Sequence, residues 1–167
     1  GWTTIDGDGD GYNWLLGSTL ISTGYGHNGS SDLVLSQSYD NNYGAVTPNN
    51  FLVSPTKAAY TGISFWACAQ DASWASEHFG VAVSTAGNTS ASDFTTVQEW
   101  TMTSKSSGVM APGRNGQTRA QGTWYEYTVD LSAYAGQEIY VAIRHFNCTD
   151  MFYLDVDDIT LGDGSKN

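Results

Sequence analysis

Three aspartates alternate with glycines near the start of the chain, in the segment Asp6-Gly7-Asp8-Gly9-Asp10-Gly11-Tyr12. Ca²⁺ prefers oxygen ligands, and loops of the D-x-D-x-D-G type supply three carboxylates, a tight glycine turn and then a backbone carbonyl. Tyr12 stands at the position of that carbonyl. The sequence therefore predicts a calcium site on Asp6, Asp8, Asp10 and Tyr12, the alternative being a solvated Asp-Gly turn without an ion.

The loop is not an EF-hand. That motif needs a bidentate glutamate at its twelfth position, where this chain has Gly17, and it needs two flanking helices. The flanks, WTTI at 2–5 and WLL at 14–16, are short and β-like. The missing ligands must come from elsewhere in the chain, so the ion is expected to brace separate loops.

Other residues that could do chemistry give weaker signals. The nearest base beside a carboxylate is Glu77-His78, and neither a G-x-S-x-G nor an H-E-x-x-H motif is present. Paired carboxylates for glycoside hydrolysis are an alternative, drawn from Asp71, Glu77, Glu99 and Glu126. Most acidic residues are better explained by ion binding or turns, and we predict no catalytic residues.

The two cysteines, Cys68 and Cys148, each follow an apolar strand-like run. They could pair across adjacent strand ends or remain free as small buried hydrophobic groups, and sequence does not decide between these states. A C-x-x-C or Cys-His metal spacing is not recognised, which argues against redox or zinc chemistry.

Composition restricts the class of partner. The chain has 167 residues, six Lys plus Arg against 17 Asp plus Glu, and a formal net charge of −11. This charge argues against nucleic acid or an anionic membrane as a partner. No apolar run approaches the roughly 18 residues of a membrane span, so no direct membrane insertion is expected. We expect residues 1–167 to form a single domain, a module of a longer multidomain surface protein.

Short segments with apolar-polar alternation predict many strands and almost no helix. The expected strands are 31–38, 62–68, 79–84, 94–102, 124–130, 138–146 and 151–161. Turns are expected at Asn49-Asn50, 86–88, 113–116 and 135–136, and single helical turns in 89–94 and 131–134. The fold class predicted is an all-β jelly-roll sandwich of two antiparallel sheets with structural calcium.

Six motifs, in order, extend over nearly the whole chain: WTTIDGDGDG at 2–11, NNFLVSP at 49–55, FWACAQD at 65–71, ASEHF at 75–79, TRAQGTWY at 118–125 and RHFNCTD at 144–150. Together they resemble the cleaved-adhesin domains of gingipain proteases and related haemagglutinins. The resemblance implies a non-catalytic, calcium-stabilised jelly roll, similar in fold to MAM domains and carbohydrate-binding modules, on a secreted or surface-anchored bacterial protein. It also implies partners among host extracellular proteins, haemoglobin or haem, and glycans.

The resemblance also implies where metal ligands lie. Asp6, Asp8, Asp10 and the Tyr12 carbonyl match the family's first loop, and closing oxygens are expected from Gly26-His27-Asn28. A possible second calcium site matches at Asn50 and at Asp157-Asp158. Successive strand residues point to opposite faces, so only one of these two aspartates can face inward, as a ligand or as a hydrogen-bonded structural residue.

A ligand-binding surface is harder to locate. Trp66 and Trp124 lie in expected strands and are assigned to the core, whereas Trp74 lies in a polar loop and is the first candidate for contact. Arg114 and Arg119 flank the Asn115-Gly116 turn and are candidates for gripping a carboxylate, or are solvated loop charges. The three histidines are haem-iron candidates or structural residues. Two functions remain open, an adhesin module and a carbohydrate-binding module accessory to a secreted enzyme.

Overall fold

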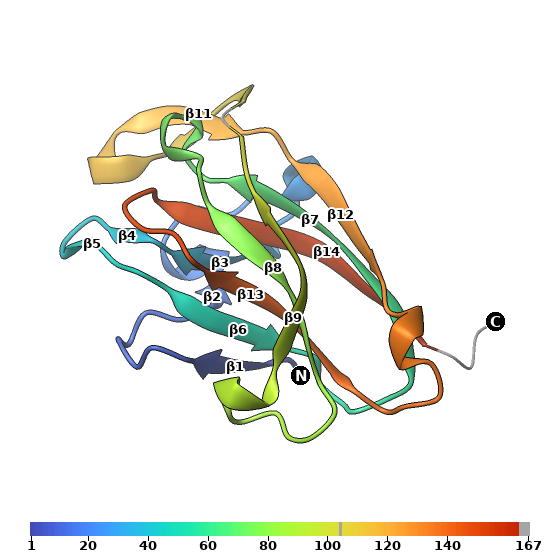
Figure 1. The fold of residues 1–167 in the computed structure, drawn as a ribbon. Helices are drawn as coiled ribbons and strands as arrows, with labels where there is room; N and C mark the ends of the chain where they lie inside the picture. The colour runs from blue at the N-terminus through green and yellow to red at the C-terminus, as the bar shows by residue number, and fades with distance from the viewer. Residues whose placement is uncertain (104, 164–167) are drawn as a thin grey trace.

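Two five-stranded antiparallel sheets pack face to face in the computed structural model, which describes residues 1–103 and 105–163 (Figure 1). The first sheet has the order β1 (Thr3–Asp6), β6 (Asn49–Val53), β13 (Tyr140–Phe146), β8 (His78–Ser84) and β9 (Thr95–Thr101). The second has the order β12 (Tyr125–Asp130), β7 (Tyr60–Ala69), β14 (Tyr153–Asp163), β3 (Val34–Gln37) and β2 (Leu15–Leu16). The predicted all-β sandwich is confirmed.

Two small hairpins extend from the sandwich, β4 (Tyr39–Asp40) with β5 (Gly44–Ala45), and β10 (Ser106–Pro112) with β11 (Thr118–Gly122). Helical structure in the described residues consists of single 3₁₀ turns: η1 (Gly17–Thr19), η2 (His27–Gly29), η3 (Ala72–Trp74), η4 (Ala91–Asp93), η5 (Arg114–Gly116) and η6 (Ser132–Tyr134). η4 and η6 confirm the two expected helical turns. Among the residues described, no helix has the length and apolar character needed to span a membrane.

The core forms because apolar side chains alternate along strands of both sheets and meet between them. Phe65 of β7 and Phe79 of β8 are fully buried, and their ring centroids lie 6.2 Å apart across the two sheets. Ile143 of β13 and Leu154 of β14 fill the same layer. This interior holds the strands in register and leaves the connecting loops to form the surface features described below.

All seven predicted strands are present with small shifts at their ends. The expected turn at Asn49-Asn50 is wrong, because both residues lie in β6. Their amides have partners inside the structure: Asn49 Oδ1 accepts from Arg144 Nε, and Asn50 Nδ2 donates to Ser36 Oγ. A pair of asparagines can therefore occupy a strand when its side chains are hydrogen-bonded.

The two cysteines are free. Cys68 is buried in β7 of the second sheet, with Sγ 3.7 Å from Asp155 Oδ2. Cys148 follows β13 of the first sheet, with Sγ 3.6 Å from Glu77 Oε1. Each thiol thus has its own carboxylate partner, and the pairing alternative is not realised.

Candidate functional site

The acidic loop begins where β1 ends. Asp6 pairs with Asn50 in the β1–β6 ladder, and the Gly7 N–H donates to Asn49 O at 2.8 Å. A Cβ at Gly7 would lie 2.6 Å from that carbonyl oxygen, so the chain needs glycine here. Gly9 and Gly11 adopt φ values of 68° and 84°, which fold the segment back on itself and gather its three carboxylates.

The carboxylates of Asp6, Asp8 and Asp10 each offer an oxygen within 4.8 Å of the others. Asp6 accepts from the Gly9 and Gly11 N–H groups at 3.1 and 2.8 Å, and Asp10 accepts from the Tyr12 N–H at 2.9 Å. Partial burial of the carboxyl, with hydrogen bonds to Asp6 and Asp10 and the charge of Asp10, raises the pKa of Asp8 to about 7. The three carboxylates repel one another when all are ionised, and a hard cation, which prefers oxygen ligands, would offset that repulsion.

Contacts connect this acidic segment to the β4–β5 hairpin, and the hairpin to the β10–β11 turn. The Tyr12 and Tyr43 rings touch edge to face, with centroids 6.0 Å apart. Tyr39 OH donates to Asn115 Oδ1 at 2.6 Å, and the Asn115 N–H donates to Asn41 Oδ1 at 2.8 Å. The loop after β1, the β4–β5 hairpin and the β10–β11 turn are thereby linked, and the first two lie together on the left of Figure 1.

Gly26-His27-Asn28 does not close the acidic loop. The segment packs on the second sheet, where the His27 ring stacks on Trp66 of β7 with centroids 3.9 Å apart. The His27 N–H donates to Asp157 Oδ2 at 3.0 Å, and its Nδ1 lies 2.7 Å from Asp158 Oδ2. The expectation that Gly26 and Asn28 complete the first calcium site is therefore corrected: the segment belongs with Asp157 and Asp158.

Asp157 and Asp158 do not follow the strand alternation expected for them, because Asp158 lies at a bulge of β14 and both carboxylates contact His27. Asp157 is buried and accepts from the backbone N–H groups of His27 and Asp158, whereas Asp158 is exposed and has a φ of 50°. These contacts match the hydrogen-bonded structural role. Asn50 stands opposite His145 in the first sheet, so the structure does not bring it into one site with this pair.

Trp74 and Arg114 form a clamp instead of a free contact surface. The Arg114 guanidinium lies between two rings, 3.6 Å from the Trp74 centroid and 3.7 Å from that of Tyr39. Its NH1 donates to the carbonyls of Asp150 and Met151 at 2.8 and 3.0 Å, and its NH2 to Asp150 Oδ1 at 2.7 Å. Arg114 is only 8% exposed. This packing corrects the expectation that Arg114 is free to grip a carboxylate, whereas Trp74, the candidate for contact, is half-buried with its ring against the guanidinium.

Arg119 has a buried partner as well. Its Nε lies 3.4 Å from Asp71 Oδ2, and its NH2 donates to Gln117 Oε1 at 2.7 Å. The Asp71 carboxylate is fully buried and also accepts from the Arg114 N–H. The Arg119 guanidinium therefore pairs with a buried carboxylate, and the Arg119 side chain is only 35% exposed.

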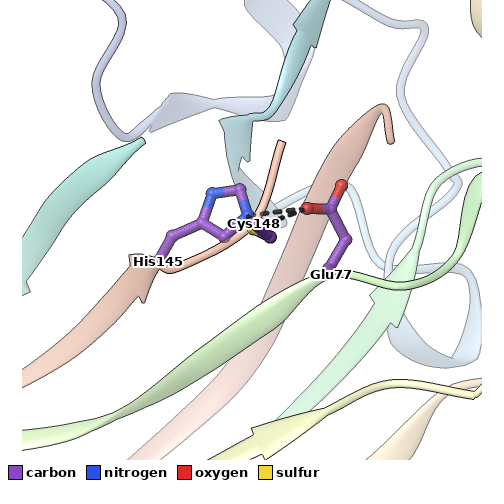
Figure 2. Close-up of side chains that lie close together, drawn as sticks. All are labelled: Glu77, His145 and Cys148. Atoms are coloured by element: carbon purple, nitrogen blue, oxygen red, sulfur yellow. Dashed lines mark hydrogen bonds and ion pairs between the residues drawn. The ribbon is translucent and has the colours of Figure 1, made fainter. Parts of the chain in front are cut away.

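Sequence reasoning missed a buried cluster of Glu77, His145 and Cys148 (Figure 2). Glu77 pairs with His145, their Oε1 and Nε2 atoms 2.7 Å apart, while the sequence neighbour His78 faces Glu99. Cys148 Sγ lies 3.4 Å from the same imidazole nitrogen. The His145-x-x-Cys148 spacing corrects the expectation that the chain has no Cys-His metal spacing, and Glu77 is brought in by the pairing of β8 with β13.

The fold and its loop arrangement define a jelly-roll β-sandwich module. The chain belongs to the Cleaved Adhesin Domain family, whose model matches residues 1–161. It is 42% identical over 166 residues to Hemagglutinin A and 44% identical over 169 residues to Gingipain R1, both of Porphyromonas gingivalis. These matches cover 98% and 99% of this chain but only 8% and 9% of those proteins.

Solved structures show the same relationship. The K3 cleaved adhesin domain of Lys-gingipain from Porphyromonas gingivalis matches with a TM-score of 0.78 and 42% identity, covering 98% of this chain and 91% of that one. TmCBM61, solved in complex with β-1,4-galactotriose, matches with a TM-score of 0.51 and 13% identity, covering 97% and 88%. The second likeness is one of fold alone.

Proposed function

We propose that this chain is a calcium-stabilised, non-catalytic adhesion module of a secreted or cell-surface bacterial protein. Its ligand is a host extracellular protein, haemoglobin or haem, or a glycoprotein. Membership of the cleaved-adhesin family supports the adhesive role, and the names of its relatives support the extracellular setting. The convergence of Asp6, Asp8 and Asp10 in one glycine-rich loop carries the calcium part of the proposal.

Calcium would act on the loop by replacing carboxylate repulsion with attraction. The proposed ligands are the carboxylates of Asp6, Asp8 and Asp10 with the Tyr12 carbonyl, and water completes the set. The proposal keeps calcium at this loop only, because Asp157 already has backbone donors and Asn50 lies in the first sheet. A bound ion would fix Tyr12 and, through their ring contact, Tyr43.

The surface beside the loop supports contact with a protein or glycoprotein. Tyr43 is 67% exposed, and aromatic side chains with a polar tip are enriched in binding hot spots. Asn41 of the same hairpin accepts a hydrogen bond from the Asn115 N–H, and it lines a pocket of about 350 Å³ together with Gly116 and Gln117. An exposed aromatic ring on a hairpin whose polar groups are tied to a neighbouring loop suits contact with a protein surface.

A glycan-binding role is the second candidate, favoured by a groove of about 420 Å³ that Trp100, Tyr125 and Tyr127 line. The Trp100 and Tyr127 rings are 4.8 Å apart but inclined at 57°, so these two do not form the flat platform on which a sugar ring stacks. This geometry ranks the glycan role below the adhesive one.

The test is a binding array of haemoglobin, haem, matrix proteins and glycans, with calcium and with chelator. Three variants separate the surfaces: Tyr43→Ala at the loops, Tyr125→Ala in the groove, and Val97→Ala as an exposed control on β9. Protein or haem binding that Tyr43→Ala weakens and Val97→Ala preserves supports the adhesin. Glycan binding that only Tyr125→Ala weakens would replace it with the carbohydrate-binding role.

A further inference from the structure

The cluster of Glu77, His145 and Cys148 lies in the interior beside the turn that follows β13 (Figure 2). The carboxylate and the imidazole are fully buried, and Cys148 is partly exposed. The three candidate ligand atoms form a small triangle: Nε2 to Oε1 is 2.7 Å, Nε2 to Sγ is 3.4 Å, and Oε1 to Sγ is 3.6 Å. The proposed adhesive role does not use these three groups, so their close approach needs a separate explanation.

These distances approach one face of a tetrahedral zinc site. With Zn–N and Zn–O near 2.0–2.2 Å and Zn–S near 2.3 Å, tetrahedral geometry places N and O about 3.3 Å apart and each of them about 3.5 Å from sulfur. The two sulfur edges already agree with these values. Only the hydrogen-bonded Nε2–Oε1 edge must open, by about half an ångström, when an ion replaces the proton between the two atoms.

Each buried ligand is held by a second partner. Glu77 Oε2 accepts from Ser38 Oγ at 3.0 Å and from the Phe152 N–H at 3.2 Å, which turns Oε1 toward the imidazole. His145 Nδ1 lies 2.7 Å from Ser36 Oγ, which in turn accepts from Asn50 Nδ2. Outer partners of this kind orient ligands in metal sites and fix the histidine tautomer.

We propose that Glu77 Oε1, His145 Nε2 and Cys148 Sγ form a binding site for a thiophilic divalent metal ion of the Zn²⁺ class, with water in the fourth position. On binding, Cys148 releases its thiol proton to solvent, and the imidazole carries its single proton on Nδ1, facing Ser36. The negative charges of the Glu77 carboxylate and the Cys148 thiolate then neutralise the two positive charges of the ion. The role goes beyond the proposed adhesion and is separate from the calcium loop, whose ligands are all oxygens.

The ligand set selects against other roles for this cluster. Burial, followed by the charge of Glu77, raises the pKa of the Cys148 thiol well above its ordinary value, so the metal-free thiol is not an activated nucleophile. A thiolate and an imidazole favour Zn²⁺ over Ca²⁺ or Mg²⁺. The partly exposed Cys148 provides the entry path for the ion.

The test is titration of metal-free protein with Co²⁺, followed by displacement with Zn²⁺. We expect one equivalent of Co²⁺ to produce a thiolate-to-metal charge-transfer band in the near ultraviolet, which Zn²⁺ abolishes. Cys148→Ala should remove the band and weaken Zn²⁺ affinity by more than the roughly 10–100-fold that loss of an outer partner costs. Cys148→Ser serves as a second variant, and a thermal melt of each metal-free variant verifies that it is folded.

Two controls identify the site. Cys68→Ala removes the other thiol, which faces Asp155, and should leave the band intact. Asp8→Asn alters the calcium loop and should leave Zn²⁺ affinity unchanged. The proposal is overturned if folded wild-type protein gives no band and no stoichiometric Zn²⁺ binding, or if the band persists in folded Cys148 variants.

Discussion

The guanidinium carbon of Arg114 lies 3.6 Å from the centre of the Trp74 ring, with the Tyr39 ring on its other side. Its three side-chain hydrogen bonds go to the turn before β14. This clamp joins the η5 turn to the β13–β14 connection and to η3. Trp74 and Arg114, which were predicted from the sequence to contact a ligand, thus pack against each other and hold the loops together.

Arg114→Lys should destabilise the fold. Lysine cannot reproduce the planar stacking or the forked donation to Asp150 and Met151, and it leaves their part-buried carbonyls without the Arg114 donor. We expect the free energy of unfolding to fall by about 1–3 kcal/mol, measured by urea denaturation. Lys57→Ala, which removes an exposed cation, is the control and should change little. Equal midpoints for Arg114→Lys and wild type would show that the clamp adds no stability.

Asp8 should make the stability of the calcium-free protein depend on pH. Its pKa is raised in the folded state from the ordinary 3.8 to about 7, so the native protein binds more protons than the unfolded chain in that interval. Stability in chelator should therefore decrease as pH rises from about 4 to about 7, and level off above that value.

Thermal melts across this range, with and without chelator, measure the effect. Calcium binds the ionised carboxylates, so the stabilisation it gives should be greatest above about pH 7. Asp8→Asn should flatten the chelator profile over the same interval. A wild-type profile that rises with pH in chelator would contradict the assignment of Asp8.

Both thiols should resist alkylation in the folded protein. Burial raises the pKa of Cys68, as does the charge of Asp155, and burial with the charge of Glu77 raises that of Cys148. At neutral pH, iodoacetamide should label the native protein much more slowly than a free thiol, and denaturant should expose two reactive thiols per chain. Intact mass that shows a disulfide, or prompt labelling of folded protein, would disprove this.

Alternation along the chain was enough to predict seven strands of the two main sheets and the sandwich, because a half-buried strand repeats every two residues. Among the strands it missed is β6, since Asn49 and Asn50 have the composition of a turn, and in the strand their side chains are hydrogen-bonded to Arg144 and Ser36. The acidic loop was also predictable, because its spacing is local. The clamp at Trp74 and the cluster at Cys148 depend on strand pairing and on contacts between residues distant in sequence, which local spacing does not reveal.

We propose above all that a calcium ion on the Asp6–Asp10 loop stabilises the module. The most direct test is a thermal melt of wild type and of Asp8→Ala, each in calcium and in chelator. A ligand that binds only the folded state adds roughly 4 kcal/mol at a thousandfold excess over its Kd, and each kcal/mol raises the Tm of a domain of this size by about 2–4 °C. We predict that chelator lowers the wild-type Tm by several degrees, and that Asp8→Ala has a low Tm that calcium does not restore. A wild-type Tm that is the same in calcium and in chelator, with no calcium recovered by elemental analysis, would contradict the account.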